Sequence, residues 1–522
     1  MTDRLDRALQ ALSRSYPGPG GAVAVLKDGA VLARHSWGYA NAERRVPFTP
    51  RTLFRMCSIT KQFTCGLVLD AFPDPTALDG AVAERLPNLK GIAPGLLHLC
   101  HNQSGLRDYW AAAMLHGSPV EAPFADREAS ALILANRSLQ FRPGTRYSYC
   151  NNNFRLLSDI LEAHAGESFA DLLRTHIFDR VGMETAFVAA DTRAMPDGTE
   201  GYEGSQAGGF RAAENRIHWT GDAGLGASLD DMVAWERFVD AGRDDPESLY
   251  ARLSAPVTFA DGAPAHYGFG LARRQEFGRH VIGHGGALRG WRSHRLYSAQ
   301  DRVSVVVMFN HLSDAQAAAL DVLAAVLGID RAQPDPNLPA PTWLGSYVEP
   351  ESKLAVRIDA AAPGQVRLRF GHSAEKLDLQ PDGSAGSGTP AAPDGTRLRW
   401  VDGSLWMGRP GENMSARLDP CTGTPATDIA GRYRCAELGT ELDIAEAGGV
   451  LYGAFSGTLG SGRMELLDPV GPDLWTLPCW RALDHTPPGD WTLRVRRDAL
   501  GVATGLTVGC WLARGLDYAK VG

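Results

Sequence analysis

The chain reads Met56-Cys57-Ser58-Ile59-Thr60-Lys61, and an apolar run with helical spacing follows this stretch. Ser58 and Lys61 form an S-x-x-K pattern, and residues three apart lie on one face of a helix, one turn from each other. Ser58 would lie near the start of that helix, where free N–H groups and the helix dipole favour negative charge. A serine hydroxyl needs an adjacent base before it attacks a carbonyl, and a desolvated lysine can be that base. By itself the pattern is more often a capping serine and a solvated lysine.

A second motif, Y-x-N, lies in Arg146–Asn151 (RYSYCN), just before a stretch with helical spacing. The phenol of Tyr149, if close to Lys61, could relay a proton to a leaving group. Asn151 could hydrogen-bond the backbone of a substrate. The ordinary alternative for Tyr149 is a packed aromatic ring whose hydroxyl is satisfied.

A third motif is Gly283-His284-Gly285-Gly286-Ala287. Its glycines suit a strand edge that another backbone approaches closely, and His284 adds a titratable group there. The ordinary alternative is a histidine in a turn. The order S-x-x-K, Y-x-N, H-x-G nevertheless favours a catalytic serine over three unrelated coincidences.

Signatures of several other enzyme classes are absent from the sequence. It contains no G-x-S-x-G, no phosphate-binding G-x-x-x-x-G-K-[ST] and no zinc-binding H-E-x-x-H. The 522 residues are 44% hydrophobic and 21% charged, as in folded soluble proteins, and the length suggests about three domains. A net charge of −8 gives no basic footprint for nucleic acid. We expect neither a cofactor nor a metal.

The cysteines and the apolar segments bear on location. None of the eight cysteines lies in a C-x-x-C pair, and this usage fits reduced thiols. The start of the chain shows an amphipathic helix rather than the apolar core of a signal peptide, and no run of 18 apolar residues follows. We therefore expect a cytoplasmic protein without membrane contact.

The periodicity of the sequence changes near residue 330. Before it, helical and strand patterns alternate, with a hairpin over Gly21–Leu32 that turns at Asp28-Gly29 and a helix from about Phe154 to Gly166. A proline-rich stretch over residues 331–342 suits a linker. After it the period is two, which predicts half-buried antiparallel strands, with an exposed loop over Pro381–Gly395.

The β-rich region also looks duplicated. Leu344-Gly345-Ser346-Tyr347 is echoed by Ala430-Gly431-Arg432-Tyr433, and an apolar strand follows each copy, ending at Phe370 and at Phe455. Two copies of one all-β unit are the simplest explanation.

The three ordered motifs resemble the penicillin-recognising serine hydrolases. Within that clan the chain is most similar to the D-aminopeptidase family, on the stretches CSITKQFTC (57–65), CHNQSGLRDYW (100–110), YSYCNNNFR (147–155), GHGGALRGWR (283–292) and VGCWLARG (508–515). The resemblance implies an α/β (α+β) β-lactamase-like domain over 1–330. It also implies a linker over 331–342 and two all-β antiparallel, lipocalin-like barrel domains over 343–420 and 421–522.

The resemblance also implies roles for residues. Ser58 is expected to be the acylated nucleophile, with Lys61 and Tyr149 as its proton partners and His284 where relatives place a lysine or histidine. Which of Lys61 and Tyr149 is the primary base stays open. Substrate contacts are expected from Asn151, Gly285, Gly286, Ala287 and Asp484. The N–H groups of Ser58 and Ala287 would form an oxyanion hole. Asp484, in the loop Cys479–Trp491, would bind the substrate ammonium; without the resemblance it reads as a solvated turn carboxylate.

The implied activity is release of N-terminal D-amino acids (D-Ala, D-Ser, Gly) from peptides, amides or esters through an acyl-enzyme. A carboxylesterase or a β-lactamase-like hydrolase of the same clan is the alternative. A non-catalytic ligand-binding or scaffold protein would be expected to have lost the serine or the lysine, and both are present. The resemblance further implies a homodimer, a small peptide or amino-acid amide as substrate, and β-lactams as inhibitors.

Overall fold

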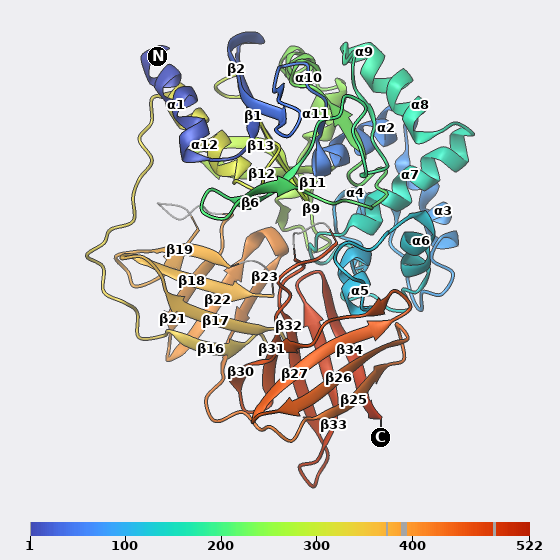
Figure 1. Ribbon diagram of the computed structural model, residues 1–522, viewed down its shortest axis with the longest axis vertical. Coiled ribbons are helices and arrows are strands. Elements are labelled where there is room, and N and C mark those ends of the chain that lie inside the picture. The colour runs from blue at the N-terminus through green and yellow to red at the C-terminus, as the bar shows by residue number, and fades with distance from the viewer. Residues whose placement is uncertain (1, 372–373, 388–393, 484–486, 522) are drawn as a thin grey trace.

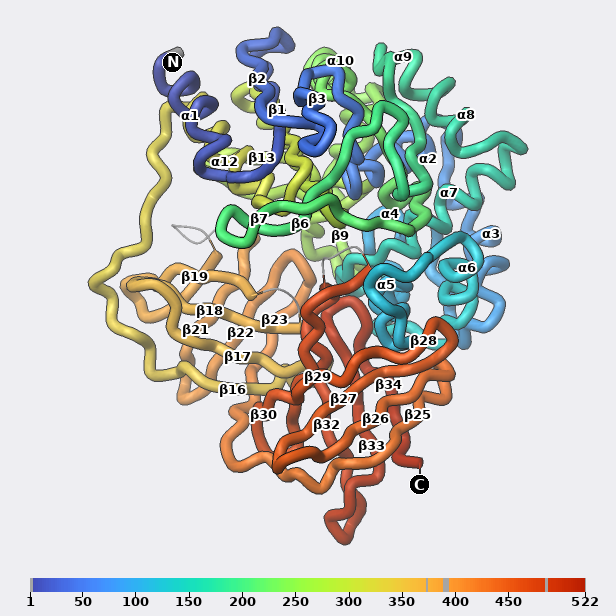
Figure 2. Tube along the Cα trace, viewed as in Figure 1, coloured from blue at the N-terminus to red at the C-terminus, as the bar shows by residue number. Residues whose placement is uncertain are grey.

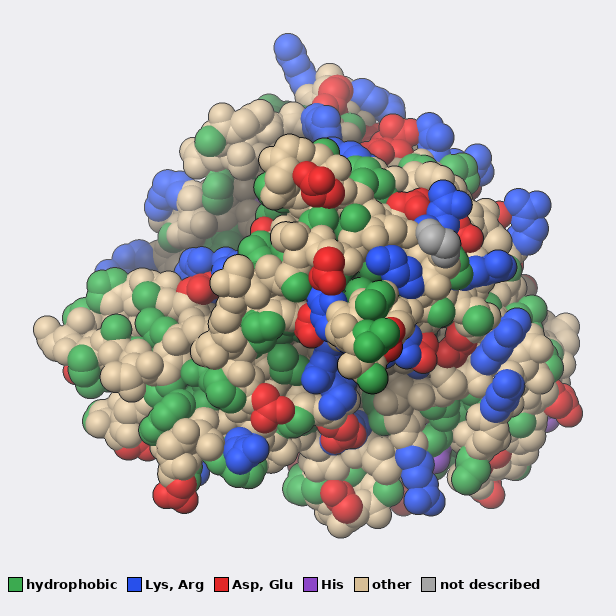
Figure 3. Space-filling model, turned by 90° about the horizontal axis from the view of Figure 1, so that it is seen from below, with side chains coloured by type: hydrophobic (Ala, Val, Ile, Leu, Met, Phe, Trp, Pro, Cys, Tyr) green, Lys and Arg blue, Asp and Glu red, His purple; other side chains and the backbone are tan. Residues whose placement is uncertain are grey.

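The computed structural model describes the chain except residues 1, 372–373, 388–393, 484–486 and 522. Figure 1 shows an N-terminal unit of helices around a sheet, and two β units below it. On the face in Figure 3, acidic and basic side chains are interspersed, without one dominant charged patch. No described helix is both long enough and apolar enough to cross a bilayer.

An eight-stranded antiparallel sheet forms the middle of the N-terminal unit, in the order β11-β12-β13-β14-β15-β1-β2-β3. The predicted hairpin is present, with Asp28 and Gly29 both at positive φ between its strands. The strands are β1 (Gly20–Lys27), β2 (Ala30–Asn41), β3 (Val46–Pro47), β11 (Tyr267–Gly268), β12 (Leu271–Glu276), β13 (Arg279–Leu288), β14 (Trp291–Ser298) and β15 (Val303–Phe309).

Helices cover both faces of this sheet, because alternate residues of a strand point to opposite sides. Val305 and Val307 of β15 pack with α1 (Thr2–Ser15) and α12 (Ala315–Leu327), whereas Val306 and Met308 belong to the larger core on the other face. That second core includes α2 (Thr60–Ala71), α7 (Asn151–Ala165) and α10 (Leu229–Ala241). The predicted helix before Gly166 is confirmed as α7, and Gly166 ends it at φ 72°.

Shorter elements complete the N-terminal unit. The remaining helices are α3 (Asp79–Glu84), α4 (Leu96–Cys100), α5 (Tyr109–Leu115), α6 (Asp126–Leu134), α8 (Phe169–Leu173), α9 (Asp179–Val181) and α11 (Leu249–Leu253). The small strands are β4 (Phe54–Arg55), β5 (Phe187–Val188), β6 (Tyr202–Ser205), β7 (Gly209–Ala212), β8 (Leu225–Ala227), β9 (Val257–Thr258) and β10 (Pro264–Ala265).

Residues 331–342 form neither helix nor strand and lead into the first β unit, a barrel-like sheet of nine strands. Its strands are β16 (Gly345–Val348), β17 (Ala355–Ala360), β18 (Gln365–Phe370), β19 (Glu375–Leu379), β20 (Ala385–Gly386), β21 (Arg397–Val401), β22 (Ser404–Arg409), β23 (Met414–Arg417) and β24 (Asp419–Pro420). The expectation of an exposed loop over Pro381–Gly395 is wrong at Ala385–Gly386, because β20 is buried there and pairs with β19 and β21; residues 388–393 lie outside the described residues.

The last β unit is a barrel-like sheet of ten strands. They are β25 (Gly431–Cys435), β26 (Thr440–Ala447), β27 (Val450–Gly457), β28 (Gly460–Ser461), β29 (Glu465–Leu466), β30 (Asp468–Gly471), β31 (Leu474–Leu477), β32 (Trp491–Arg497), β33 (Ala503–Cys510) and β34 (Ala513–Val521).

The expected duplication is visible in the strand register. Tyr347 pairs with Val356, which pairs with Phe370, and in the last unit Tyr433 pairs with Leu442, which pairs with Phe455. Each tyrosine hydroxyl also donates to the carbonyl oxygen four residues earlier, at 2.8 Å in the first unit and 2.7 Å in the last. The two β units therefore repeat one structural pattern.

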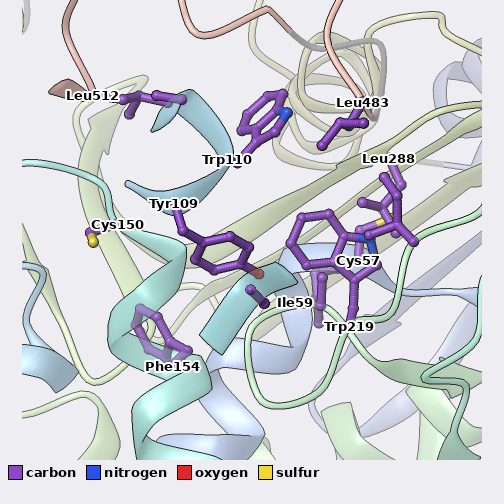
Figure 4. Packing of buried hydrophobic residues seen from close by; sticks show 14 of the residues in the cluster. Cys57, Ile59, Tyr109, Trp110, Cys150, Phe154, Trp219, Leu288, Leu483 and Leu512 are labelled. Atoms are coloured by element: carbon purple, nitrogen blue, oxygen red, sulfur yellow. The ribbon is translucent and has the colours of Figure 1, made fainter. Parts of the chain in front are cut away.

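The last β unit packs directly against the N-terminal unit beside α5 (Figure 2), and one hydrophobic core runs through both. Arg107 Nη1 contacts Glu437 at 3.0 Å, and the Asp108 N–H donates to the Leu512 carbonyl at 3.0 Å. Leu512 and Leu483 of the last unit accordingly lie near Trp110 of α5 (Figure 4). This contact brings a loop of the last unit to the serine motif.

Candidate active site

Ser58 lies in a tight turn at the head of α2. Residues Cys57–Ile59 form one 3-10 turn, and Cys57 has φ 54°, a left-handed conformation that costs energy for any residue except glycine. Cys57 and Ile59 are fully buried, whereas Ser58 is half-buried. The turn therefore presents the Ser58 hydroxyl between two residues that are packed in the core.

The Lys61 ammonium lies next to that hydroxyl. Its Nζ donates to Ser58 Oγ at 3.0 Å, to Asn151 Oδ1 at 2.9 Å and to the Asp222 carbonyl at 2.7 Å. All three acceptors are formally uncharged. Burial lowers the pKa of Lys61 to about 8, although the charges of Asp222 and Asp108 act in the opposite direction. Near neutral pH a fraction of Lys61 is therefore present as the neutral amine, the form that a general base needs.

Tyr149 is the second proton partner of Ser58. Its hydroxyl donates to Ser58 Oγ at 2.6 Å, and Lys61 Nζ lies 4.8 Å from the centre of its ring. Burial raises the pKa of Tyr149 well above its usual value, and the hydrogen bond to Ser58 opposes this only in part. Tyr149 therefore keeps its proton and donates to Ser58. Lys61, once neutral, can still donate to Asn151 Oδ1 and the Asp222 carbonyl while its lone pair accepts from the Ser58 hydroxyl.

Asn151 is held in place rather than left open to solvent. Its Nδ2 donates to Asp108 Oδ2 at 3.0 Å, and its backbone N–H donates to the same oxygen at 2.5 Å. This fixes the amide so that Oδ1 faces Lys61. Both ends of the Asn151 amide are thus engaged within the protein, and its expected contact with substrate stays a prediction. The geometry instead makes Asn151 a positioning residue for Lys61.

His284, on β13, is uncharged in this arrangement. Its Nδ1 lies 2.5 Å from the Gly285 carbonyl, an acceptor, so Nδ1 carries the proton and Nε2 accepts from the Tyr267 hydroxyl at 3.1 Å. Burial, together with the charge of Lys61, lowers the pKa of His284 to about 3. The His284 ring lies beside Tyr149, with 6.3 Å between ring centres. His284 therefore brings a neutral imidazole, not a cation, to the serine.

Gly286 brings β13 against the serine turn. A Cβ at Gly286 would lie 2.4 Å from the Met56 carbonyl oxygen, 3.0 Å from Cys57 Cβ and 2.2 Å from Ser293 Oγ. No side chain fits there without moving β13 away from the turn. The backbone of Ala287, which comes next, is thereby kept close to Ser58.

We expect Gly286→Ala to reduce kcat about 100-fold or more, the usual cost of misplacing reacting groups by about 1 Å. Steady-state kinetics would measure this, with Gly408→Ala as the control, because a Cβ there meets nothing within 4 Å. Unchanged kinetics for Gly286→Ala would contradict the close packing of β13 on the serine turn.

A loop of the last β unit reaches the other end of β13. It connects β31 to β32 and is called here the 479–490 loop. Ala482 and Leu483 are buried, and Leu483 lies near Leu288 and Trp110 (Figure 4). Arg289 Nη2 donates to the Ala482 carbonyl at 3.4 Å. Asp484 itself lies outside the described residues.

Charged side chains pair around this loop. Arg481 Nη2 lies 3.1 Å from Glu121 and 3.3 Å from Glu203, and Arg289 Nε lies 3.3 Å from Glu203. The guanidinium of Arg289 is 1% exposed and the carboxylate of Glu203 8%, so this pair is shielded from solvent, whereas Arg481 and Glu121 are partly exposed. They join the loop to the N-terminal unit beside Leu288.

The depressed pKa of Lys61 predicts a stability effect that depends on pH. Because the folded pKa of about 8 lies below the usual lysine value of 10.5, the unfolded chain binds more protons between these values, and stability rises with pH there. Lys61→Met should therefore raise the thermal midpoint at pH 7 by a few degrees, about 2–6 °C. The gain should shrink from pH 8 towards 10.5. Scanning calorimetry of both proteins at pH 7 and again near pH 10 tests this prediction. A gain in thermal midpoint that grows with pH would contradict it.

Several residues of the site were not found from the sequence. Asp108, Asp222 and Tyr267 contact Asn151, Lys61 and His284, respectively, across the fold. Asp108 lies within CHNQSGLRDYW, a stretch that carried the resemblance, but nothing in that stretch indicates its partners. Arg289 and Glu203 had no sequence signal, because their contacts depend on how the last β unit docks.

Comparison with known proteins gives matches over nearly the whole chain. Residues 5–328 match the Beta-lactamase family model, and residues 337–519 match the model "D-aminopeptidase, domain B". The chain is 59% identical over 523 residues to a D-aminopeptidase of Gluconobacter oxydans, covering 99% of each chain. It is 46% identical over 517 residues to one of Brucella melitensis, covering 99% of this chain and 98% of the relative.

Solved structures share the fold. The octameric penicillin-binding protein homologue from Pyrococcus abyssi has a TM-score of 0.53 at 20% identity, covering 80% of this chain and 99% of that one. A D-amino acid amidase from Ochrobactrum anthropi has a TM-score of 0.50 at 21% identity, covering 62% of this chain and 99% of the amidase. At these identities the likeness shows the fold alone.

Proposed function

The chain belongs to the D-aminopeptidase family of β-lactamase-fold hydrolases, and from this premise we propose that Ser58 releases N-terminal D-residues from small peptides, amides or esters. One observation carries the proposal: Ser58 Oγ accepts hydrogen bonds from both Lys61 Nζ and the Tyr149 hydroxyl, at 3.0 and 2.6 Å. Lys61 can take a proton and Tyr149 can give one, and a serine next to such a pair is equipped for acyl transfer.

In the proposed acylation step, neutral Lys61 takes the Ser58 proton while Oγ forms a bond to the substrate carbonyl carbon. The N–H groups of Ser58 and Ala287 stabilise the developing oxyanion. Tyr149 then gives its proton to the leaving nitrogen as the C–N bond breaks, and Lys61 returns a proton to the tyrosinate. In deacylation, water takes the place of the leaving amine and attacks the acyl carbon. The same proton transfers run in reverse, the ester bond to Ser58 Oγ breaks, and the free acid is released. The low pKa of Lys61 and the high pKa of Tyr149 favour Lys61 as the base and Tyr149 as the acid.

The remaining site residues receive supporting roles in this proposal. Gly285 and Gly286 leave the edge of β13 open to a substrate backbone, and Asn151 orients Lys61. Neutral His284 accepts from Tyr267 and lies against Tyr149 without adding a positive charge that would favour the tyrosinate.

We assign the substrate ammonium to Asp484 in the 479–490 loop, on the strength of the family pattern and of the loop's position beside Leu288. Asp484→Asn should lower kcat/KM for D-alanine p-nitroanilide about 10-fold or more, because a shielded ion pair is lost. The measured quantity is the ratio of kcat/KM for this substrate to that for its N-acetyl form. Asp490→Asn, which removes a charge from the same loop, is the control. An unchanged ratio in Asp484→Asn would remove Asp484 from amine recognition.

Four substrates assayed side by side test the activity: D-alanine p-nitroanilide, its L-isomer, a chromogenic cephalosporin and a simple ester. Preference for the D-anilide supports the proposal. Preference for the cephalosporin or the ester would favour the β-lactamase-like or carboxylesterase alternative, and inactivity on all four would favour a non-catalytic binding protein. The division at residues 330, 342 and 420, a homodimer and a cytoplasmic location complete the proposal.

A further inference from the structure

A cavity of about 200 Å³ adjoins the proton partners of Ser58 on the side away from the 479–490 loop. Tyr149, His284 and Tyr267 form one wall, and Gly283 and Gly285 of β13 form another. At roughly 30 Å³ for each water-sized group, this volume suits one small amino-acid residue. The cavity is not used by the steps proposed above.

Strand β13 shows which part of a substrate would reach this cavity. Gly286 packs on the Ser58 turn, so the scissile carbonyl lies at that level of the strand. Leu288 and Arg289 lie on one side of Gly286, next to the 479–490 loop, and His284 and Gly283 lie on the other, next to the cavity. If the loop receives the N-terminal residue, the cavity receives the residue after the scissile bond. Tyr149, the donor to the leaving nitrogen, lines the cavity.

Two polar groups in the cavity wall make no hydrogen bond within the described part of the chain. Arg274 of β12 lines the cavity, is solvent-exposed, and makes no hydrogen bond or ion pair with any residue that the structure describes. His294 of β14 is only 9% exposed, and its Nδ1 has no hydrogen-bond partner among the same described residues. Beside it, Gly285 leaves open the space where a Cβ would come 3.1 Å from that nitrogen.

The charge of Arg274 reaches across the cavity. Burial is the main reason that the pKa values of His284 and His294 are lowered, and Arg274 contributes to both. Both imidazoles are therefore neutral, and Arg274 is the cation of the cavity wall. Glu276 also lines the cavity, and burial raises the pKa of its carboxyl.

We propose that this cavity binds the residue released by cleavage and that Arg274 binds its free α-carboxylate, so that dipeptides with an N-terminal D-residue are the preferred substrates. The proposal rests on the aminopeptidase function proposed above. A guanidinium pairs with a carboxylate through two parallel hydrogen bonds, and His294 can add a third donor when Nδ1 carries its proton.

The test compares three substrates in wild type and Arg274→Gln: D-alanyl-glycine, D-alanyl-glycinamide and D-alanine amide. The first has the carboxylate, the second fills the cavity without it, and the third releases only ammonia. Wild type should prefer D-alanyl-glycine to its amide by about tenfold in kcat/KM, the usual gain from a charge-assisted pair. Arg274→Gln should abolish this preference and leave D-alanine amide within about twofold, since ordinary surface changes have small effects.

Three further variants separate the effects of charge from those of structure and bulk. Arg274→Lys should restore part of the preference, and Glu276→Gln, a matched loss of charge on the same strand, should not reduce it. Gln316→Trp, which adds bulk to the cavity from α12, should slow cleavage of both dipeptides and spare D-alanine amide. Equal losses of Arg274→Gln on all three substrates, or an unchanged preference, would overturn the proposal. Failure of wild type to cleave D-alanine amide would instead count against the proposed function.

Discussion

Ser58→Ala is expected to reduce kcat for D-alanine p-nitroanilide by roughly a million-fold, the scale seen when a catalytic serine is removed from a hydrolase. One half-buried hydroxyl is lost, and the packing of Cys57 and Ile59 around it is unchanged. The thermal midpoint should therefore move by less than about 2 °C. Initial rates at saturating substrate and scanning calorimetry measure the two quantities.

Ser293→Ala is the matched control. Ser293 Oγ donates to the Met56 carbonyl at 3.0 Å, so this serine is buried just behind the same turn without reaching the proton partners. Its loss should cost less than about tenfold. Mass spectrometry after reaction with a slowly released acylating substrate should place the adduct on Ser58. An adduct on another serine would transfer the nucleophile role to that residue.

Lys61→Ala and Tyr149→Phe are each expected to lower kcat by about three orders of magnitude or more, and the double variant by little more than the worse single one. Residues that act as one unit lose activity non-additively. Both side chains meet at Ser58 Oγ, and Lys61 Nζ lies over the Tyr149 ring, so one proton path serves both.

Wild type, the two single variants and the double variant should be compared in log kcat at a pH above 8, where wild-type Lys61 is mostly neutral. Tyr147→Phe is the control for Tyr149→Phe, because Tyr147 is a neighbouring tyrosine on the same segment that makes no contact with Ser58 among the described residues. Fully additive losses would show that Lys61 and Tyr149 do not share a proton path.

Local patterns were sufficient to predict much of the fold. The hairpin at Asp28-Gly29 and the end of α7 at Gly166 both depend on residues adjacent in sequence, and both are present. The three-residue spacing of Ser58 and Lys61 likewise predicted that the two side chains lie together, and they do. By contrast, β20 consists of two residues inside a Gly/Ser-rich stretch, so its pairing with β19 and β21, not its composition, makes it a strand.

The electrostatic properties of the site could not be predicted in this way. His284 was expected to provide a titratable group, yet burial and the proximity of Lys61 keep it neutral. The substrate contact expected of Asn151 stays a prediction, but the sequence did not indicate that Asp108 holds its amide towards Lys61. Both results depend on which chain segments surround a side chain in three dimensions, and a motif does not contain that information.

The docking of the last β unit has a consequence for the order in which a newly made chain acquires its contacts. Asp108 holds Asn151, which accepts from Lys61, and the Asp108 N–H is itself bonded to the Leu512 carbonyl. A ribosome makes Leu512 after Asp108, with 512 − 108 = 404 residues of synthesis between them. Domains fold as they emerge, so we expect the N-terminal unit to fold before this support exists. We therefore expect the serine site to be completed only once the last β unit has been made.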